Sequence, residues 1–189
     1  FDSTLPVSVV NIERNYYNDV NWNDVSSISG TSSDATSGIS SMEIALQRSN
    51  DLAYWSGLVW TLSETWLSPN ELGNWTYYFT DLNNAVNYTV QSRATDNAGN
   101  VQTTYGSDSF IYDITLPLIG SVADGLNSDD QEWTNDLTTI SAIWTGFSDA
   151  LSGLASYEYS IGIVAGGTQT IPWTDVGLDT SIINSTLTL

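Results

Sequence analysis

The stretch Leu82-Asn83-Asn84-Ala85-Val86-Asn87-Tyr88-Thr89-Val90-Gln91-Ser92-Arg93-Ala94-Thr95-Asp96 carries the clearest signal of the fold. Within it, the side chains of Tyr88, Val90, Ser92 and Ala94 alternate with polar neighbours. Alternation with period two predicts a β-strand that packs one face on a core and turns the other to solvent. The same alternation recurs at 42–47, 75–80 and 110–112 and, in the second half of the chain, at 140–144 and 157–161.

Clusters of Gly, Asn, Asp and Ser separate these segments, and no stretch of ten or more residues has a helical pattern of apolar positions. Many short strands with turn signals between them favour an antiparallel β-sandwich. We expect strands near 7–12, 25–31, 41–48, 57–62, 75–80, 87–95 and 106–112, and then near 118–123, 137–144, 155–162, 169–173 and 182–189.

The chain contains a tandem repeat of a whole domain. Phe1-Asp2-Ser3-Thr4-Leu5-Pro6 returns as Tyr112-Asp113-Ile114-Thr115-Leu116-Pro117, and Ser33-Asp34-Ala35-Thr36-Ser37-Gly38 returns as Ser148-Asp149-Ala150-Leu151-Ser152-Gly153. Between these anchors, Trp22 returns as Trp133, and Ile28-Ser29 as Ile140-Ser141. Anchors in one order at a nearly constant spacing indicate two copies of one structural unit. The sequence therefore predicts two domains, 1–111 and 112–189.

The segment 82–90 resembles the tyrosine corner of fibronectin type III and immunoglobulin-like domains, in which a Leu and a Tyr six residues apart flank a turn. The resemblance implies that the Tyr88 hydroxyl bonds to the turn backbone. The alternative is a generic hairpin with a buried Tyr. Neither this corner nor the Asp-x-Ala-Gly-Asn loop that follows it has a second copy.

Several further motifs resemble bacterial immunoglobulin-like and fibronectin type III-like repeats of large secreted or cell-surface proteins. They are Arg93-Ala94-Thr95-Asp96-Asn97-Ala98-Gly99-Asn100, the Asp-x-Thr-x-Pro starts at Asp2 and Asp113, the Ser-Asp-x-x-Ser-Gly loops, and Tyr54-Trp55-Ser56-Gly57 with Trp60. The fold expected from pattern and resemblance together is all-β, with tandem Ig/FN3-like sandwiches of which the second lacks its last two strands. The resemblance implies an architecture and an extracellular or cell-surface location, and no reaction.

Without those two strands, we expect Trp144, Tyr157, Tyr159 and Ile161 to face water and the strand near 155–162 to offer an unpaired edge. Two explanations stay open. Either the natural chain continues past Leu189, or a neighbouring molecule supplies the missing strands.

The composition excludes several classes of function. There are 22 acidic and only 3 basic residues, a net charge of −19, so the chain cannot neutralise nucleic-acid phosphates. The chain has no apolar run long enough to span a membrane, which argues against membrane insertion. The lack of His and Cys removes the Ser-His-Asp and Cys-His arrangements and the usual zinc sites. A glycosidase needs its carboxylates in a cleft, which a sandwich of about 100 residues does not form, so we expect no enzyme.

Acidic loops are expected to converge at one end of the first domain. In a seven-stranded sandwich the N-terminus and the loops near 34 and 97 share a pole, which brings together Asp2, Asp34, Asp96 and Asn100. Carboxylate and amide oxygens are the ligands that Ca²⁺ prefers, so these residues are candidate Ca²⁺ ligands. The alternative is that each side chain only caps its own loop through Asx-turn hydrogen bonds.

Aromatic residues are dense between 54 and 78, and exposed flat rings stack on sugars. Trp55, Trp60 and Trp66 are therefore candidates for carbohydrate binding, against the alternative that they belong to the core.

These observations favour a structural repeat segment, a stalk, fibre or adhesin of a large extracellular or surface-attached prokaryotic protein. Its expected partners are neighbouring repeats or subunits of the same protein, and surface glycans. The second hypothesis is a carbohydrate-binding accessory module of a secreted hydrolase.

Overall fold

The computed structural model describes residues 1–20, 22, 27–127, 134–136 and 138–187. These residues form fourteen strands, divided between two compact units, Phe1–Ile114 (unit 1) and Thr115–Leu189 (unit 2). Trp133, one of the repeat anchors, lies outside the described residues. None of the helices searched in the described part of the chain has the length and hydropathy needed to cross a membrane.

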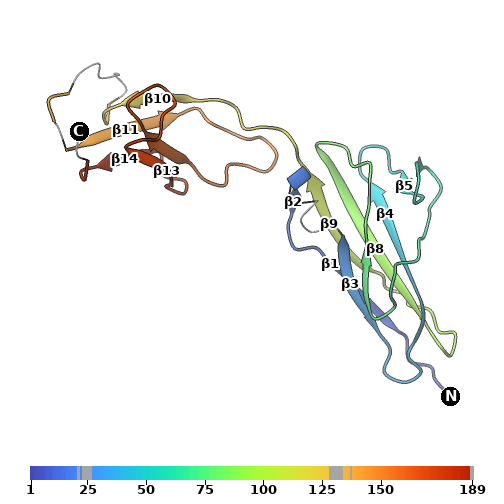
Figure 1. Ribbon diagram of the computed structural model, residues 1–189. Coiled ribbons are helices and arrows are strands. Elements are labelled where there is room, and N and C mark those ends of the chain that lie inside the picture. The colour runs from blue at the N-terminus through green and yellow to red at the C-terminus, as the bar shows by residue number, and fades with distance from the viewer. Residues whose placement is uncertain (21, 23–26, 128–133, 137, 188–189) are drawn as a thin grey trace. The chain divides into compact units, whose positions relative to one another are not determined.

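Unit 1 is built from two sheets (Figure 1). The three-stranded sheet has the order β1-β3-β7, with strands Val7–Asn11, Ile28–Ser33 and Asn74–Tyr77. The larger sheet has the order β2-β9-β8-β4-β5-β6, with strands Tyr16–Tyr17, Gly106–Tyr112, Val86–Asp96, Ile39–Arg48, Tyr54–Trp55 and Trp60–Thr61. All neighbours are antiparallel except β2 and β9, which are parallel. This division of the strands is that of an immunoglobulin-like sandwich, and the all-β prediction is confirmed.

The core of unit 1 lies between the sheets and follows the alternation of the sequence. Every second residue of β8 from Val86 to Asp96 is buried. The central side chains are Trp75, Phe79 and Tyr88, each 0% exposed, with Ile44 and Leu46 from β4 beside them. Cross-strand aromatic packing tightens this layer, because the rings of Tyr88 and Phe110 stack at 5.4 Å. Burial of these rings is the main source of the unit's stability.

The predicted tyrosine corner is confirmed. The backbone N–H of Asn83 donates a hydrogen bond of 2.6 Å to the hydroxyl of Tyr88. The turn between them holds Ala85 at a φ of 62°, a left-handed conformation that only a few non-glycine residues adopt. The buried hydroxyl therefore fixes the turn that leads into β8.

Unit 2 repeats part of this architecture. One sheet has the order β10-β11-β14, with strands Ser121–Asp124, Ile140–Thr145 and Ser181–Asn184, and the other pairs β12 (Glu158–Ile161) with β13 (Ile171–Asp175). The sheet β10-β11-β14 reproduces β1-β3-β7, since Ile28 and Ile140 hold equivalent places in the middle strand. Among the described residues of unit 2, none forms a counterpart of β8 or β9, so the second sandwich is incomplete.

The strand expected near 57–62 is present as β6, the second arm of a tight hairpin with β5 that is closed by the Ser56 N–H donating to the Val59 carbonyl at 2.9 Å. One local expectation needs correction. Trp144 was expected to face water but is only 6% exposed. The ring of Tyr157, 5.7 Å away, covers it from within the same unit.

Candidate metal centre

Four predicted ligands lie at one pole of unit 1. Asp2 precedes β1, Asp34 follows β3, Asp96 is the last residue of β8, and Asn100 lies in the loop between β8 and β9. Asp96 is 1% exposed, and Asp2 and Asp34 are partly buried. The sandwich topology brings these distant parts of the sequence together because neighbouring strands of the two sheets end there.

One oxygen of each carboxylate holds its own loop. Asp34 Oδ1 accepts hydrogen bonds from the N–H groups of Thr36, Ser37 and Gly38 at 3.0, 2.8 and 3.1 Å. Asp96 Oδ1 accepts from two N–H groups of the β8–β9 loop at 2.9 and 2.7 Å. Asp2 Oδ1 accepts from one, that of Thr4, at 2.9 Å. These are Asx-turn contacts, so the loop-capping alternative is part of the structure.

The loop-capping alternative does not account for the second oxygen of each carboxylate. Asp2, Asp34 and Asp96 each place a carboxylate oxygen within 4.8 Å of the others. The Oδ2 atoms of Asp2 and Asp34 are buried and accept no hydrogen bond within the described residues. A buried charged oxygen without a donor is costly, because it has lost its hydration and gained nothing in return. A cation placed between these oxygens would supply the missing partner.

Hydrogen bonding keeps the two loop carboxylates ionised. Burial by itself raises the pKa of the Asp34 carboxyl, but donation from Ser37, Thr36 and Gly38 outweighs it and holds the pKa below the usual value. The charge of Asp96 acts in the raising direction. Burial likewise raises the pKa of Asp96, and donors from Asn100 and the loop backbone outweigh it, so that this pKa is also lowered. The pole therefore gathers ionised groups that repel one another.

Asn100 sits at this pole, but with its amide nitrogen toward the carboxylates. Its Nδ2 donates to Asp96 Oδ2 at 2.7 Å and to the Asp2 carbonyl at 3.3 Å. To serve as an oxygen ligand, the amide would have to turn over. In the present orientation Asn100 is a neutral donor that partly satisfies Asp96 and links the N-terminal segment to the β8–β9 loop.

The arginine closest in sequence is engaged elsewhere. Arg93 forms an ion pair with Glu43 on the adjacent strand, with 2.7 Å between Nε and Oε2, and its guanidinium lies 4.1 Å from the Trp66 ring centre. Arg48 pairs with Asp51 at 2.7 Å. Neither guanidinium is therefore available to neutralise the cluster.

The loop that holds Asp34 is itself repeated. In unit 2, Asp149 Oδ1 accepts hydrogen bonds from the N–H groups of Leu151, Ser152 and Gly153 at 3.0, 2.8 and 3.1 Å. The geometry matches that of Asp34 to Gly38. This loop conformation is therefore encoded locally in the Ser-Asp-x-x-Ser-Gly sequence and forms without an equivalent of Asp96.

The three candidate tryptophans for sugar binding lie in different surroundings. Trp55 is 4% exposed, and its ring packs against Trp60 at 5.3 Å. Trp60 in turn lies over Tyr88 at 5.7 Å and under the Arg48 guanidinium at 4.6 Å. Trp66 is half-buried, with Arg93 over its ring and Tyr105 against it at 5.1 Å. Trp55 and Trp60 thus serve the core and its edge, which does not favour sugar stacking on them.

A buried polar network between β1 and β8 was not predicted from the sequence. Ser8 Oγ donates to Gln102 Oε1 at 2.7 Å and lies 2.9 Å from Ser92 Oγ. Gln102 also accepts from the Ala94 N–H at 3.1 Å. Ser8 and Ser92 occupy inward positions of the alternating pattern, and a polar residue at such a position is the sequence signal that could have indicated the network. The network ties β1 to β8 through Gln102, which follows Asn100 by two residues.

Comparisons with known proteins were made for the whole chain. No family model and no curated protein matches it. A solved structure, the FN1–FN3 domains of chicken CNTN1, is similar at 10% sequence identity with a TM-score of 0.35. The match covers 97% of this chain and 57% of that one, so the chain spans little more than half the length of that structure.

Proposed function

We propose that the chain is a structural segment of a large protein built from tandem immunoglobulin-like repeats, carried on the outside of a prokaryotic cell, where it serves as a stalk, fibre or adhesin. The observation that supports this most is the recurrence of one sheet, one loop and one start motif in two successive units. Stacked copies of a small sandwich set distances between other parts of a protein. The partners in this role are neighbouring repeats or subunits.

Antibodies raised against the 189-residue chain test the location. On intact cells of the source organism, we expect labelling without permeabilisation, and loss of that label after brief protease treatment of the cells. Labelling that appears only after permeabilisation would contradict a surface role.

We further propose that the pole of unit 1 holds one divalent cation, with Asp2, Asp34 and Asp96 as carboxylate ligands. Hard oxygen donors without nitrogen or sulfur are the chemistry of Ca²⁺, which completes six to eight oxygens with backbone carbonyls and water. The ion would offset the repulsion among the carboxylates and tie the N-terminal segment to two loops. Its role is structural, since it cross-links segments that carry no disulfide.

Thermal unfolding tests the ion directly. A cation that binds only the folded state stabilises it by about 2.7 kcal/mol when present at 100 times its Kd. The Tm in millimolar CaCl₂ should therefore exceed the Tm in EGTA, with MgCl₂ as the control for non-specific screening. Equal Tm values in CaCl₂ and EGTA would remove the metal site.

A further inference from the structure

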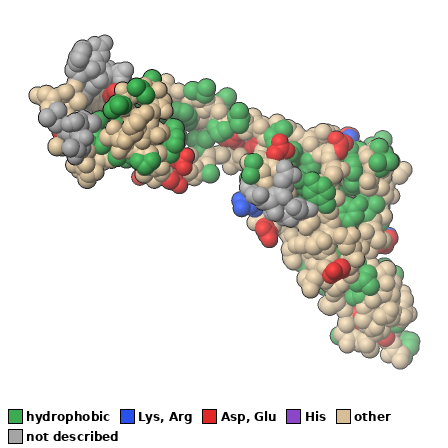
Figure 2. Space-filling view, viewed as in Figure 1, with side chains coloured by type: hydrophobic (Ala, Val, Ile, Leu, Met, Phe, Trp, Pro, Cys, Tyr) green, Lys and Arg blue, Asp and Glu red, His purple; other side chains and the backbone are tan. Residues whose placement is uncertain are grey.

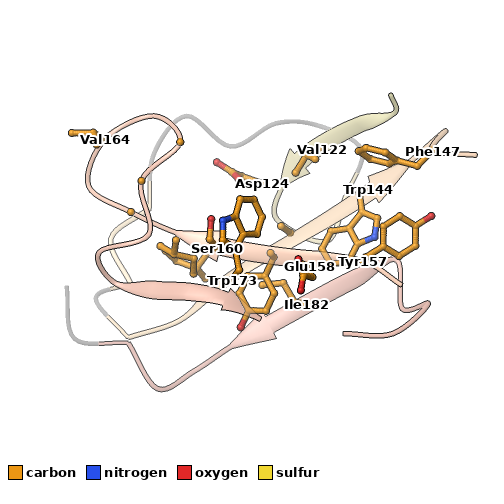
Figure 3. Close-up of a pocket in the computed structure, with 17 residues that line it drawn as sticks. Val122, Asp124, Trp144, Phe147, Tyr157, Glu158, Ser160, Val164, Trp173 and Ile182 are labelled. Atoms are coloured by element: carbon orange, nitrogen blue, oxygen red, sulfur yellow. The ribbon is translucent and has the colours of Figure 1, made fainter. Parts of the chain in front are cut away.

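Unit 2 contains an open apolar cleft between its two sheets. The cleft measures about 680 Å³. Its lining comes from both sheets and includes Val122, Trp144, Tyr159, Ile161, Trp173 and Ile182. Figure 3 shows the Trp173 indole standing in the middle of this space, with Trp144 and Tyr157 grouped at one end. Figure 2 shows hydrophobic side chains gathered on the visible face of this unit.

A tryptophan next to the central strand is buried in unit 1, whereas a tryptophan next to β12 is exposed in the cleft of unit 2. In unit 1, Trp55 lies on the strand next to β4 and is 4% exposed. In unit 2, Trp173 lies on the strand next to β12 and is 63% exposed. Every member of the large core cluster belongs to unit 1, whereas Trp144 and Leu187 are the buried hydrophobic residues described in unit 2. Unit 1 also has the hairpin β8–β9, whose Tyr88 packs against Trp60, and Trp60 in turn packs against Trp55.

The strand β12 also has an edge without a partner in the described part of unit 2. Its other edge is used, because Tyr157 N–H donates to the Gly177 carbonyl at 2.6 Å and Ile161 accepts from Thr170 at 3.0 Å. In an antiparallel ladder successive residues bond to opposite sides, so the backbone groups of Glu158 and Ser160 point to the free edge. In unit 1 the equivalent edge of β4 pairs with β8 along its length.

The alignment of the two repeats places a charged residue at the free edge of β12. In this alignment Ser33 matches Ser148 and Gly38 matches Gly153, and the same offset of 115 residues matches Glu43 with Glu158. Glu43 lies directly across from Arg93 of β8 and pairs with it at 2.7 Å. A strand seated on β12 in the same register would bring a cation of this kind to Glu158, which is exposed.

We infer that the cleft of unit 2 is an acceptor site for a β-hairpin of the β8–β9 type. The first strand of the hairpin pairs antiparallel with the free edge of β12, its alternate apolar side chains fill the cleft over Trp173, and its arginine meets Glu158. Backbone hydrogen bonds supply the affinity and the alternating side chains the specificity, as in other cases of strand addition. The inference stands apart from the proposed metal site and cellular location, because it uses neither the acidic pole of unit 1 nor the location of the protein.

The test adds a synthetic peptide of residues 85–113, which spans β8 and β9, to the isotope-labelled 189-residue chain. By NMR, the amides of Glu158 and Ser160 should shift and exchange with solvent at least tenfold more slowly at saturating peptide. A peptide with Ser at 88, 90 and 110 keeps length and charge but loses the apolar stripe, and should bind at least tenfold more weakly. The substitution Ser160→Pro in the chain removes an N–H from the free edge only, and should weaken binding to a similar extent.

A charge exchange tests the register. Arg93→Glu in the peptide should weaken binding, and Glu158→Arg in the chain should restore it for that peptide alone. No slowing of exchange at saturating peptide, or equal binding of the Ser-substituted peptide, overturns the inference. It is also overturned if the free chain already protects Glu158 and Ser160 and sediments as a dimer, because a second copy would then fill the cleft.

Discussion

Trp75 on β7 lies directly opposite Gly30 on β3, and its indole ring occupies the space that a side chain at residue 30 would need. A Cβ at Gly30 would also meet the Val9 carbonyl on the neighbouring strand. In unit 2 the equivalent pair is Ala142 and Ile182. The second copy of the repeat thus keeps the sheet, with Ala142 in place of Gly30 and the smaller Ile182 in place of Trp75.

Gly30→Ala should therefore destabilise unit 1 by about 1–3 kcal/mol, since the core must shift a fully buried indole or bend β1. Chemical denaturation followed by tryptophan fluorescence measures the change. Gly73→Ala is the matched control, because a Cβ there meets nothing within 4 Å. Equal free energies of unfolding for the two variants would show that the ring can move aside. Pairing Gly30→Ala with Trp75→Ile, as in unit 2, tests whether the two positions are coupled.

Tyr88→Phe should cost about 1 kcal/mol, because the ring stays packed while the Asn83 N–H loses its acceptor. Tyr88→Ala should cost about 3–5 kcal/mol, from the cavity left in the core. Urea denaturation of both variants separates the hydroxyl from the ring. Tyr16→Phe removes a hydroxyl from a ring that is 38% exposed and serves as the control. A Tyr88→Phe variant as stable as the parent chain would show that the corner is held by the ring alone.

Asp96→Asn should abolish the Ca²⁺-dependent rise in Tm. An amide oxygen still accepts the two loop N–H bonds, but the amide nitrogen takes the place of the oxygen that accepts from Asn100, and one carboxylate ligand is gone. Differential scanning calorimetry in CaCl₂ and in EGTA measures the rise. Asp136→Asn is the control, because Asp136 caps its own turn in the same way, through Thr138 and Thr139, at a place outside the cluster. An unchanged rise in Asp96→Asn would show that Ca²⁺ binds somewhere else.

Acidification in the presence of EGTA should destabilise unit 1. The pKa values of Asp34 and Asp96 are lowered in the folded chain, so the unfolded chain takes up protons first, near an ordinary Asp pKa of about 3.9. Their contribution is thus present above that pH and is lost as the pH falls through the folded pKa values. Urea denaturation between pH 6 and pH 3 measures the loss, which should be smaller in Asp96→Asn. A gain in stability on acidification would mean that repulsion among the carboxylates outweighs their hydrogen bonds.

Alternation of apolar and polar residues locates a strand well where one face of the strand is buried and the other is exposed. The expected strand 87–95 is Val86–Asp96 in the structure, and 106–112 is Gly106–Tyr112. The convergence of Asp2, Asp34 and Asp96 could also be predicted from the sequence, because loops at one end of a sandwich must lie near one another.

Other features depend on what covers a face, which alternation does not report. Trp55 lies on the strand next to β4 and Trp173 on the strand next to β12, yet Trp55 is buried and Trp173 is exposed. The orientation of the Asn100 amide is likewise set by two acceptors, the Asp96 carboxylate and the Asp2 carbonyl, and the second of these lies far away in the sequence.

The scarcity of basic residues has a practical consequence for limited proteolysis. Trypsin cuts after Lys or Arg, and this chain has no Lys and three Arg. Arg48 and Arg93 lie in the paired strands β4 and β8, whereas Arg14 is exposed between β1 and β2. Exposed loops are the sites that proteases nick in folded proteins. Folded material should therefore be cut after Arg14 alone, and the appearance of fragments ending at residues 48 and 93 would report the opening of unit 1 without any label.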